Sequence, residues 1–169
     1  MSATNALMHD ERPAFGGAVS GAVRESLESA ADCYREDADA AGRWLERAAA
    51  ADPNALAVYF ARYKFHFYQN RLAEAETAAR EGLAAAAAQG GFPADWRSLT
   101  RESASWSPAS GPQRFYLFSL KALAFIRLRQ GEAEESLALL AKLTEIDPTD
   151  QVGAEVIRAL HRGATIDAA

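Results

Sequence analysis

Residues 127–148 read RLRQGEAEESLALLAKLTEIDP and place a turn, a helix and a stop signal in one stretch. The turn is Gln130-Gly131, which follows an apolar helix that we expect over 113–129. Apolar residues then recur at helical spacing over 132–146. Asp147-Pro148 closes this second helix, because proline disfavours the helical conformation in the residue before it. The stretch therefore predicts two helices joined by a tight turn.

The same alternation of helix and turn extends through the rest of the chain. Alanine is the commonest residue and the best helix former, so we predict an all-α fold with about seven helices. Residues 1–17 show no helical periodicity and are expected to form a flexible N-terminal arm, which leaves 18–169 as a single helical domain. The other expected helices cover 19–34, 39–51, 55–69, 72–89 and 151–161, with a short helical turn at 94–99 and Asp150 as a cap for the last helix.

The helix pairs recur with a period. Ala41 and Ala75 take equivalent places in successive pairs and are 34 residues apart, whereas Ser136 follows Ala75 by one further period plus an insertion. The insertion covers about 90–112 and contains two of the three tryptophans, Trp96 and Trp106. Repeated helix pairs stack on one another, because each pair leaves an apolar face that only its neighbour can cover.

The spacing of the last pair resembles the tetratricopeptide repeat (TPR), a 34-residue helix–turn–helix with the signature W-x2-L-G-x2-Y, then A-x3-F, then P. The middle pair fits this signature less well, and the first pair keeps only its second half. The resemblance implies a short TPR-like helical-hairpin array of two to three repeats, with a tryptophan-containing insertion and a C-terminal capping helix. The residues at signature positions in the last pair are Leu120, Leu123, Ala124, Ser136, Leu140 and Pro148, with Arg127 in place of the tyrosine.

Composition and motifs argue against several classes of function. The net charge of −5 gives no reason to expect nucleic acid as a partner, and no apolar run approaches the ~18 residues of a membrane span. One cysteine, Cys33, and three scattered histidines predict no metal site. The chain has no phosphate-binding glycine loop, nucleophile elbow or metal-binding His–Glu pair. We therefore expect a cytoplasmic protein that needs no cofactor and is not an enzyme.

The few side chains that could act in catalysis or metal binding have simpler structural interpretations. Glu132, Glu134 and Glu135 are expected to be solvated in the first turn of their helix, where acidic side chains are favoured. Cys33 is expected to pack between helices. His66 lies among aromatic residues and is expected to be a packed or partly exposed imidazole rather than a ligand or a base.

Two helices carry stripes in which cationic and aromatic residues alternate. In the TPR register these stripes face the concave groove, where they would bind an acidic, apolar segment of a partner protein through aromatic anchors and arginine pairing. The stripe on 113–129 consists of Arg114, Phe118, Lys121, Phe125 and Arg129, which are spaced by 4, 3, 4 and 4. The stripe on 55–69 and the turn after it consists of Phe60, Lys64, Phe67, Tyr68 and Arg71. With Trp96 and Trp106 of the insertion, these are the predicted partner-binding residues.

One alternative is that the insertion covers the aromatic stripes of the same chain, with Trp96 or Trp106 packed on them. A clamp for a C-terminal carboxylate, which some TPR proteins build from two lysines and two asparagines, is not predicted. Lys121 fits one clamp position, but Phe125 stands where an asparagine is needed.

Three longer runs resemble a narrower group, the small TPR proteins encoded beside nitrogen-fixation genes in diazotrophic bacteria. The runs are ALAVYFARYKFHFYQNRLAEAE at 55–76, FPADWRSLT at 92–100 and QRFYLFSLKALAFIRLRQGEAEE at 113–135. The resemblance spans about 40–160 and includes the insertion. It implies an accessory factor that binds the nitrogenase molybdenum–iron protein in an immature or cofactor-deficient form, and it carries no catalytic motif.

Two other functions remain open from the sequence. Small acidic TPR proteins also serve as chaperones of type III secretion, and neighbouring secretion genes would favour that function. A homo-oligomeric TPR scaffold is the third candidate, with the aromatic helix at 55–69 as its dimer face. Sedimentation of a monomer at all concentrations would exclude it.

Overall fold

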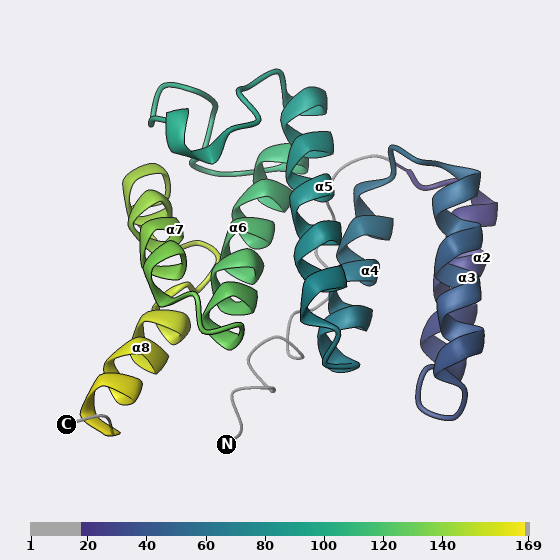
Figure 1. The fold of residues 1–169 in the computed structure, drawn as a ribbon. Helices are drawn as coiled ribbons and strands as arrows, with labels where there is room; N and C mark the ends of the chain where they lie inside the picture. Colours follow the sequence, from purple (N-terminus) through teal and green to yellow (C-terminus); the bar gives the residue numbers. More distant parts are fainter. Residues whose placement is uncertain (1–17, 168–169) are drawn as a thin grey trace.

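The computed structural model describes residues 18–167, and this part of the chain forms seven α-helices and one short 3-10 helix (Figure 1). No residue between 18 and 167 lies in a β-strand, so the all-α prediction is confirmed. The expected N-terminal arm, residues 1–17, lies outside the described residues. The helices are α2 (Gly21–Cys33), α3 (Ala38–Ala51), α4 (Leu56–Tyr68), α5 (Leu72–Gly90), α6 (Gly111–Arg129), α7 (Ala133–Ile146) and α8 (Glu155–Asp167), with the 3-10 helix η1 (Trp96–Ser98) between α5 and α6.

Consecutive helices pair into hairpins. α2 packs on α3, α4 on α5 and α6 on α7, and α8 contacts both α6 and α7. Figure 1 shows the three hairpins side by side in chain order, with α8 at the end of the row. This arrangement confirms the predicted helical-hairpin array with a C-terminal helix that covers its last pair.

Local sequence signals set several helix ends. The Ser20 hydroxyl accepts a hydrogen bond from the Val23 amide at 3.3 Å, and the Asp37 carboxylate accepts one from the Ala40 amide at 2.8 Å. Both are N-caps, which satisfy amides that have no partner within the first turn. Between α6 and α7 the turn needs a left-handed residue, and Gly131 supplies it with φ 85°.

The last helix begins later than predicted. Residues 151–154 form turns rather than the first turn of the helix, and α8 begins at Glu155. The cause is the backbone at Asp150 and Gly153, which adopt φ values of 53° and 68° and turn the chain before the helix can begin. Asp150 nevertheless acts as a cap, since its carboxylate accepts hydrogen bonds from the Ala154 amide at 2.6 Å and the Glu155 amide at 3.1 Å.

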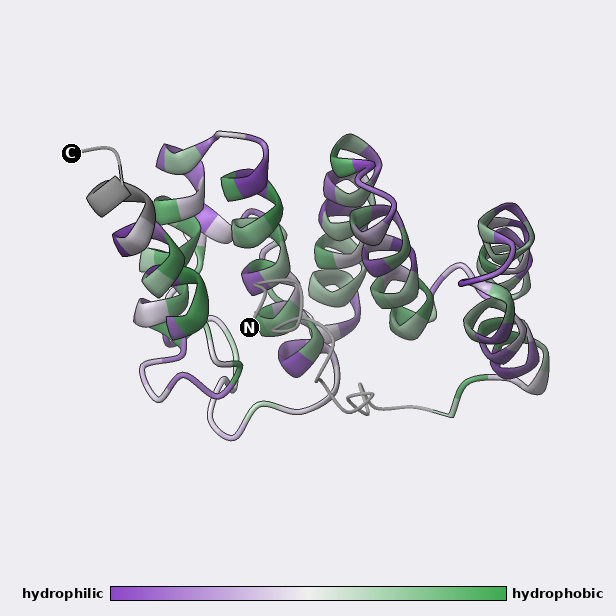
Figure 2. Cartoon of the chain, turned by 90° about the horizontal axis from the view of Figure 1, so that it is seen from below, coloured by the Kyte–Doolittle hydropathy of each residue, from purple (hydrophilic) through white to green (hydrophobic). Residues whose placement is uncertain are grey.

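Helix α6 forms the centre of the main core. Every residue from Phe115 to Ile126 is buried, so this helix is covered on all sides rather than along one face. The small residues of α5 allow the close approach. A Cβ atom added at Gly82 would lie 3.0 Å from the Phe115 ring, which leaves no room for a larger side chain. Figure 2 shows green hydrophobic and purple hydrophilic stretches along the helices of the array.

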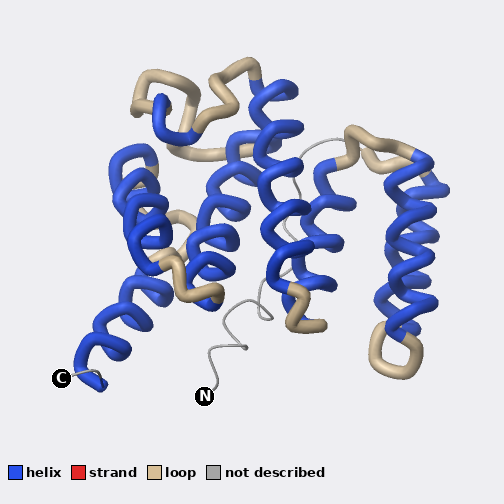
Figure 3. Tube along the Cα trace, in the orientation of Figure 1, coloured by secondary structure: helices blue, strands red, loops and turns tan. Residues whose placement is uncertain are grey.

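The insertion between α5 and α6 is the longest loop in the described part of the chain (Figure 3). It folds back and is held by side chains from distant segments. Lys142 of α7 donates a hydrogen bond to the Leu99 carbonyl oxygen at 2.6 Å, and Gln151 donates one to the Trp106 carbonyl oxygen at 2.8 Å. The insertion is therefore an integral part of the folded domain.

The N-terminal hairpin joins the rest through two small hydrophobic clusters. One contains Val23 and Ala48 with Val58 of α4, and the other contains Leu45 with Phe65 of α4. Both are separate from the main core, which covers α4 to α8. Because the contacts are split in this way, space remains between α3 and α4.

Candidate functional site

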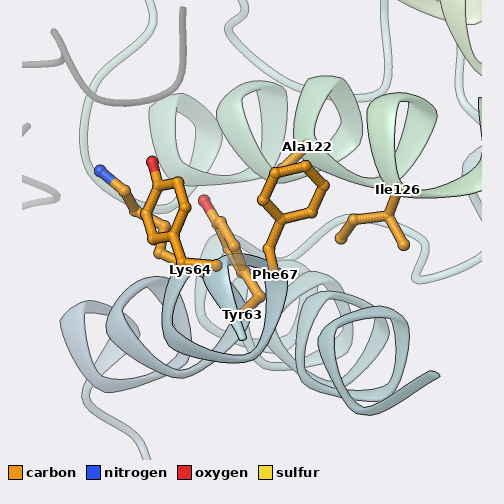
Figure 4. A pocket seen from close by; sticks show the side chains of 6 residues that line it. Tyr63, Lys64, Phe67, Ala122 and Ile126 are labelled. Carbon is orange, nitrogen blue, oxygen red and sulfur yellow. The ribbon is translucent and has the colours of Figure 1, made fainter. Parts of the chain in front are cut away.

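A narrow groove between α4 and α6, here called the α4–α6 groove, brings the two predicted stripes together. Figure 4 shows Phe67 of α4 directed toward Ala122 and Ile126 of α6. The free volume of the groove is only about 10 Å³, far below the several hundred Å³ of a small-molecule pocket. Side chains therefore fill the groove, and its outer surface is what a partner would meet. Its lining residues are Tyr63, Lys64, Phe67, Tyr68, Ala122 and Ile126.

Cationic groups lie over aromatic rings along both sides of this groove. Each cation is within 6 Å of the centre of a ring, the range in which the negative face of the ring attracts it. The pairs are Lys64 with Phe60 at 4.7 Å, Arg129 with Phe67 at 5.7 Å, Arg114 with Phe118 at 5.2 Å and Lys121 with Phe118 at 5.5 Å.

The two stripes are joined through their aromatic residues. The ring centres of Phe67 on α4 and Phe125 on α6 are 5.1 Å apart. Phe67, Phe118 and Phe125 are all buried, whereas Arg129 is exposed and Arg114 is half-buried. The aromatic rings thus form a buried base, and the cations form the accessible layer above it. A partner would contact mainly that cationic layer, with the half-buried Phe60 and Tyr68 as its aromatic part.

Lys121 does not belong to the accessible layer, which corrects its predicted role at a groove rim. Its side chain is buried, and its ammonium group donates a hydrogen bond of 2.7 Å to the Val152 carbonyl oxygen. Val152 lies in the connection between α7 and α8. Lys121 therefore ties the centre of α6 to the segment that leads into the last helix, which is a structural function.

Trp96 and Trp106 are also placed differently from the prediction. Both are buried, so neither offers a surface to a partner. Trp106 packs against Phe92 and Tyr116 with ring centres at 5.1 and 6.0 Å, and its indole N–H donates to the Thr100 carbonyl oxygen. Trp106 thus anchors the insertion on α6 through Tyr116. The ring contacts of Trp106 within the described part of the chain are thus with Phe92 and Tyr116, whereas Phe125 packs on Phe67.

Arg71 lies at a different hollow, here called the α3–α4 cavity. This hollow of about 230 Å³ lies between α3 and α4, beside the contacts that join them. Charged side chains enter it from both helices, above a small apolar surface from Leu45 and Phe65. No sequence pattern predicted it, because it arises where two hairpins meet. The lining residues are Ala38, Asp39, Gly42, Arg43, Leu45, Glu46, Arg62, Phe65, His66 and Arg71.

His66 is half-buried beside this cavity, as expected for a packed or partly exposed imidazole. Its Nδ1 atom is buried and has no hydrogen-bond partner among the described residues. Burial lowers the pKa of His66, the positive charges of Arg62 and Arg71 lower it further, and Glu74 opposes them. The ring is therefore neutral at pH 7.

Glu135 is not solvated as predicted. It is half-buried and accepts hydrogen bonds from Arg80 at 2.8 Å and from Arg127 at 2.6 Å. The turn from α6 to α7 brings Glu135 against Arg127, and the Arg97 guanidinium lies 3.8 Å from the same carboxylate. Glu132 and Glu134 are exposed, in agreement with the prediction.

Metal-binding side chains and Cys33 can be placed within residues 18–163. No group of three or more metal-binding side chains is clustered there. Cys33 is half-buried, with its sulfur 3.8 Å from the Ala30 carbonyl oxygen. None of the described helices is long and apolar enough to cross a membrane.

Comparison with known proteins gives a distant homologue. An uncharacterized 19.8 kDa protein in the nifW 5′ region of Azotobacter chroococcum mcd 1 is 31% identical to this chain over 115 residues. The alignment covers 67% of this chain and 64% of the relative, so the chain spans less than two thirds of that protein. No protein-family model matches the chain. No solved structure matches it either.

Proposed function

We propose that this protein is a non-catalytic, cytoplasmic adaptor that acts as an assembly or maturation factor in nitrogen fixation. The observation that carries the proposal is the relative encoded in the nifW 5′ region, which aligns with 115 residues of this chain. We further propose that the partner is the nitrogenase molybdenum–iron protein in an immature or cofactor-deficient form. The sequence runs at 55–76, 92–100 and 113–135 support this choice.

The fold supports an adaptor. A row of helical hairpins presents extended side-chain surfaces, which is the common use of repeat architectures. The hairpin array and the 34-residue spacing together support a TPR-like protein. The α4–α6 groove is filled by side chains, so its outer surface is what a protein partner would contact.

The accessible layer of the α4–α6 groove suits an acidic, apolar segment. Arg129 is exposed above Phe67, and Arg114 is half-buried beside Phe118. Guanidinium groups pair with carboxylates in bidentate geometry, and rings held beneath them keep the guanidinium planes in place. The proposed segment would place carboxylates on the cations and apolar side chains on Phe60 and Tyr68.

Binding of this kind gives a simple maturation cycle. The adaptor covers apolar surface that is exposed only while the partner is incomplete, and so stabilises the open form. When the partner closes, its own packing competes for the same surface and the adaptor dissociates. The adaptor would therefore be recovered with the immature partner and not with the mature enzyme.

A pull-down from the source organism tests the proposal. The tagged full-length protein is expressed in cells grown with and without fixed nitrogen, and captured proteins are identified by mass spectrometry. Recovery of molybdenum–iron protein chains, enriched from cells without fixed nitrogen, is the expected result. Recovery of secretion substrates would transfer the function to a type III secretion chaperone, and recovery of the protein alone would favour a homo-oligomeric scaffold.

Charge-reversal variants test whether the α4–α6 groove is the surface that binds the partner. Arg129→Glu combined with Arg114→Glu should lower capture at least about tenfold, because two cation–carboxylate contacts become repulsive. Arg24→Glu combined with Arg35→Glu is the matched control, since both arginines are exposed on the N-terminal hairpin. Lys121 is left intact because its ammonium group supports the fold. Equal capture by both double variants would place the interface elsewhere.

A further inference from the structure

The two helices that form the α4–α6 groove contain no acidic residue. Neither α4 (Leu56–Tyr68) nor α6 (Gly111–Arg129) includes an aspartate or a glutamate, although the whole chain has 23 of them. α4 carries two lysine or arginine residues and α6 carries four, in a protein whose net charge is −5. The groove is therefore a cationic strip on an acidic protein, and its charge favours an acidic occupant.

Three of these six cations hold the fold together. Arg62 and Arg127 form ion pairs with glutamates of other helices, and Lys121 donates a hydrogen bond to a backbone carbonyl oxygen. A contact with an aromatic ring, in contrast, leaves the positive charge of a cation in place. The half-buried or exposed cations that lie over rings of the groove are Lys64, Arg114 and Arg129.

Two cations follow one another along the groove. The Lys64 ammonium group lies over the half-buried Phe60 ring, and the Arg129 guanidinium group reaches from α6 over the Phe67 ring. Phe60 and Phe67 are seven residues apart on α4, which is about 10 Å along the helix axis. Figure 4 shows Lys64 and Phe67 on the side of α4 that faces α6. A segment that enters at the start of α4 therefore meets Phe60 first and the Arg129 charge further along.

The N-terminal segment, residues 1–17, joins the described chain beside α4. Val19 packs on the cluster that contains Val58 in the first turn of α4. From Val58 to Tyr68 the helix axis runs about 15 Å, and the helix is about 10 Å across. Seventeen extended residues span up to about 56 Å. The N-terminal segment is therefore long enough to pass around α4 and to follow the groove to its far end.

The sequence of the N-terminal segment suits the groove in composition and in order. Read back from α2, it places Phe15 first, then the acidic pair Asp10-Glu11, and then Leu7-Met8, with Arg12 as its only lysine or arginine. The groove offers an aromatic ring and then cations in the same order. Successive side chains of an extended segment point to opposite sides. Two neighbouring carboxylates can therefore face one cation on α4 and one on α6.

We propose that the N-terminal segment occupies the α4–α6 groove of its own chain as an autoinhibitory ligand. Its tether gives it an effective concentration in the millimolar range, so contacts too weak to hold a free peptide suffice. The proposal goes beyond the proposed function and rests on it only in that the acidic segment of the partner displaces this ligand. The contacts are Phe15 on Phe60, and Asp10 and Glu11 on Lys64 and Arg129.

Paramagnetic broadening in NMR spectra of the full-length protein tests the proposal. The chain has one cysteine, so Cys33→Ser combined with Ala6→Cys gives a single attachment point for a nitroxide label. When the segment is bound, the label lies near the far end of the groove and broadens the amide signals of Tyr68 and Ile126 more than that of Val58. A segment that is tethered but not bound keeps the label nearest to Val58. Greatest broadening at Val58 would therefore overturn the proposal.

Charge variants of the segment separate ion pairing from tethering. Asp10→Asn combined with Glu11→Gln should lower the ratio of bound to free segment at least about threefold, because two ion pairs are lost. Broadening at Tyr68 should fall accordingly. The matched control is Glu25→Gln combined with Glu28→Gln, which removes two exposed carboxylates from α2 and should leave the broadening unchanged. Equal loss in both double variants, or in neither, would contradict the proposal.

Charge-exchange variants test which cations hold the segment. Lys64→Glu combined with Arg129→Glu should abolish the broadening at the far end of the groove, and the further changes Asp10→Lys and Glu11→Lys should restore it, because opposite charges then face each other again. Backbone amide spectra report whether the variants are folded. Exchange of all four charges without recovery of the broadening would overturn the assigned pairing.

Two further measurements identify the occupant and separate it from the partner. Nitroxide-labelled protein mixed with isotope-labelled protein that carries no nitroxide should give no broadening, and broadening in this mixture would assign the groove to a second copy instead. In the pull-down, Asp10→Asn combined with Glu11→Gln should raise capture of the partner at least about threefold, because the open groove is more populated. Unchanged capture would overturn autoinhibition.

The segment and the partner can fail independently. The broadening is measured on the isolated protein, so the expected broadening together with a failed pull-down removes the proposed partner and leaves the occupied groove. A captured partner without broadening at the far end of the groove removes the N-terminal segment as its occupant and leaves the partner.

Discussion

Arg127 of α6 and Glu135 of α7 face each other across the turn between their helices, with 2.6 Å between Arg127 Nε and Glu135 Oε2. The pair belongs to a closed ring of four charges. Glu135 also accepts from Arg80 at 2.8 Å, Arg80 donates to Glu76 at 2.8 Å, and Glu76 accepts from Arg127 at 3.1 Å. The ring joins α5, α6 and α7. These ion pairs link the hairpin of α4 and α5 to the hairpin of α6 and α7.

Replacing Arg127 with methionine should destabilise the protein by about 1–3 kcal/mol. The substitution keeps much of the side-chain volume but leaves Glu76 and Glu135, which are 22% and 19% exposed, with only one of the two arginines that they share. Urea unfolding followed by circular dichroism measures the change. Arg24→Met at an exposed site should stay within about 0.5 kcal/mol. A loss no larger than that of the control would show that the ring adds little.

The same ring predicts how stability falls in acid. Burial alone would raise the pKa values of Glu76 and Glu135, but hydrogen bonds and charges from Arg80 and Arg127 outweigh it and bring both pKa values below 4.5. A lowered folded-state pKa contributes stability that is present above pH 4.5 and is lost as the pH falls through the folded-state values. The double variant Glu76→Gln and Glu135→Gln should therefore show a flatter loss of stability below pH 4.5.

Unfolding measured at several pH values from 6 to 3 tests this second prediction. The matched control is Glu25→Gln combined with Glu28→Gln, because both side chains are exposed on α2 and neither forms an ion pair with another described residue. This control should retain the acid dependence of the parent protein. If the stability of the Glu76→Gln and Glu135→Gln variant fell as steeply below pH 4.5 as that of the parent protein, other carboxylates would cause the loss of stability in acid.

Two helical glycines should respond oppositely to alanine. At Gly42 a new Cβ would lie 3.6 Å from the Phe65 ring, an ordinary contact, so Gly42→Ala should stabilise by about 0.5–1 kcal/mol through helix propensity. At Gly82 a new Cβ would lie 3.0 Å from both Phe115 and Tyr59. Gly82→Ala should therefore lose that gain and destabilise by about 1–2 kcal/mol through overpacking. Thermal unfolding of the two variants in parallel decides the sign, and a stabilised Gly82 variant would contradict the close packing of α5 on α6.

The helices and their pairing could be predicted because their signals are local. Caps such as Asp37, the turn glycine Gly131 and the stop before Pro148 act within a few residues of the helix end that they define. The late start of α8 escaped prediction, since it depends on the left-handed backbone at Asp150. A non-glycine residue adopts that conformation only in a particular context.

Part of the geometry of the candidate site follows from helical spacing, whereas Arg71 and Lys121 lie elsewhere than expected. Helical spacing correctly brought Phe67 and Phe125 to the same side, and the structure joins them. The burial of Lys121 depends on the carbonyl of Val152, 31 residues away, and no local pattern encodes that contact. One signal was present: the run from Phe115 to Ile126 is almost entirely apolar, which is typical of a helix covered on all sides.

Tyr68 provides a test of the aromatic part of the groove at high pH. Its hydroxyl is buried and has no hydrogen-bond partner among the described residues, and burial raises its pKa to about 12. Tyr68→Phe should therefore be neutral or stabilising at pH 7, by at most about 1 kcal/mol. Tyr59→Phe is the matched control, because the Tyr59 hydroxyl donates to the Pro53 carbonyl oxygen at 2.9 Å and its loss should cost about 0.5–1.5 kcal/mol.

The alkaline behaviour of Tyr68 follows from the same burial. In the unfolded chain its hydroxyl ionises near pH 10, whereas in the folded protein it stays neutral to about pH 12. A raised folded-state pKa contributes stability that is complete below pH 10 and is lost as the pH rises toward 12. Tyr68→Phe should thus gain stability relative to the parent protein between pH 10 and 12, as measured by urea unfolding. In an alkaline titration followed by tyrosinate absorbance, this variant should show one fewer tyrosine that ionises above pH 10. If the titration curves of the variant and the parent protein above pH 10 were the same, water would reach the Tyr68 hydroxyl in the groove.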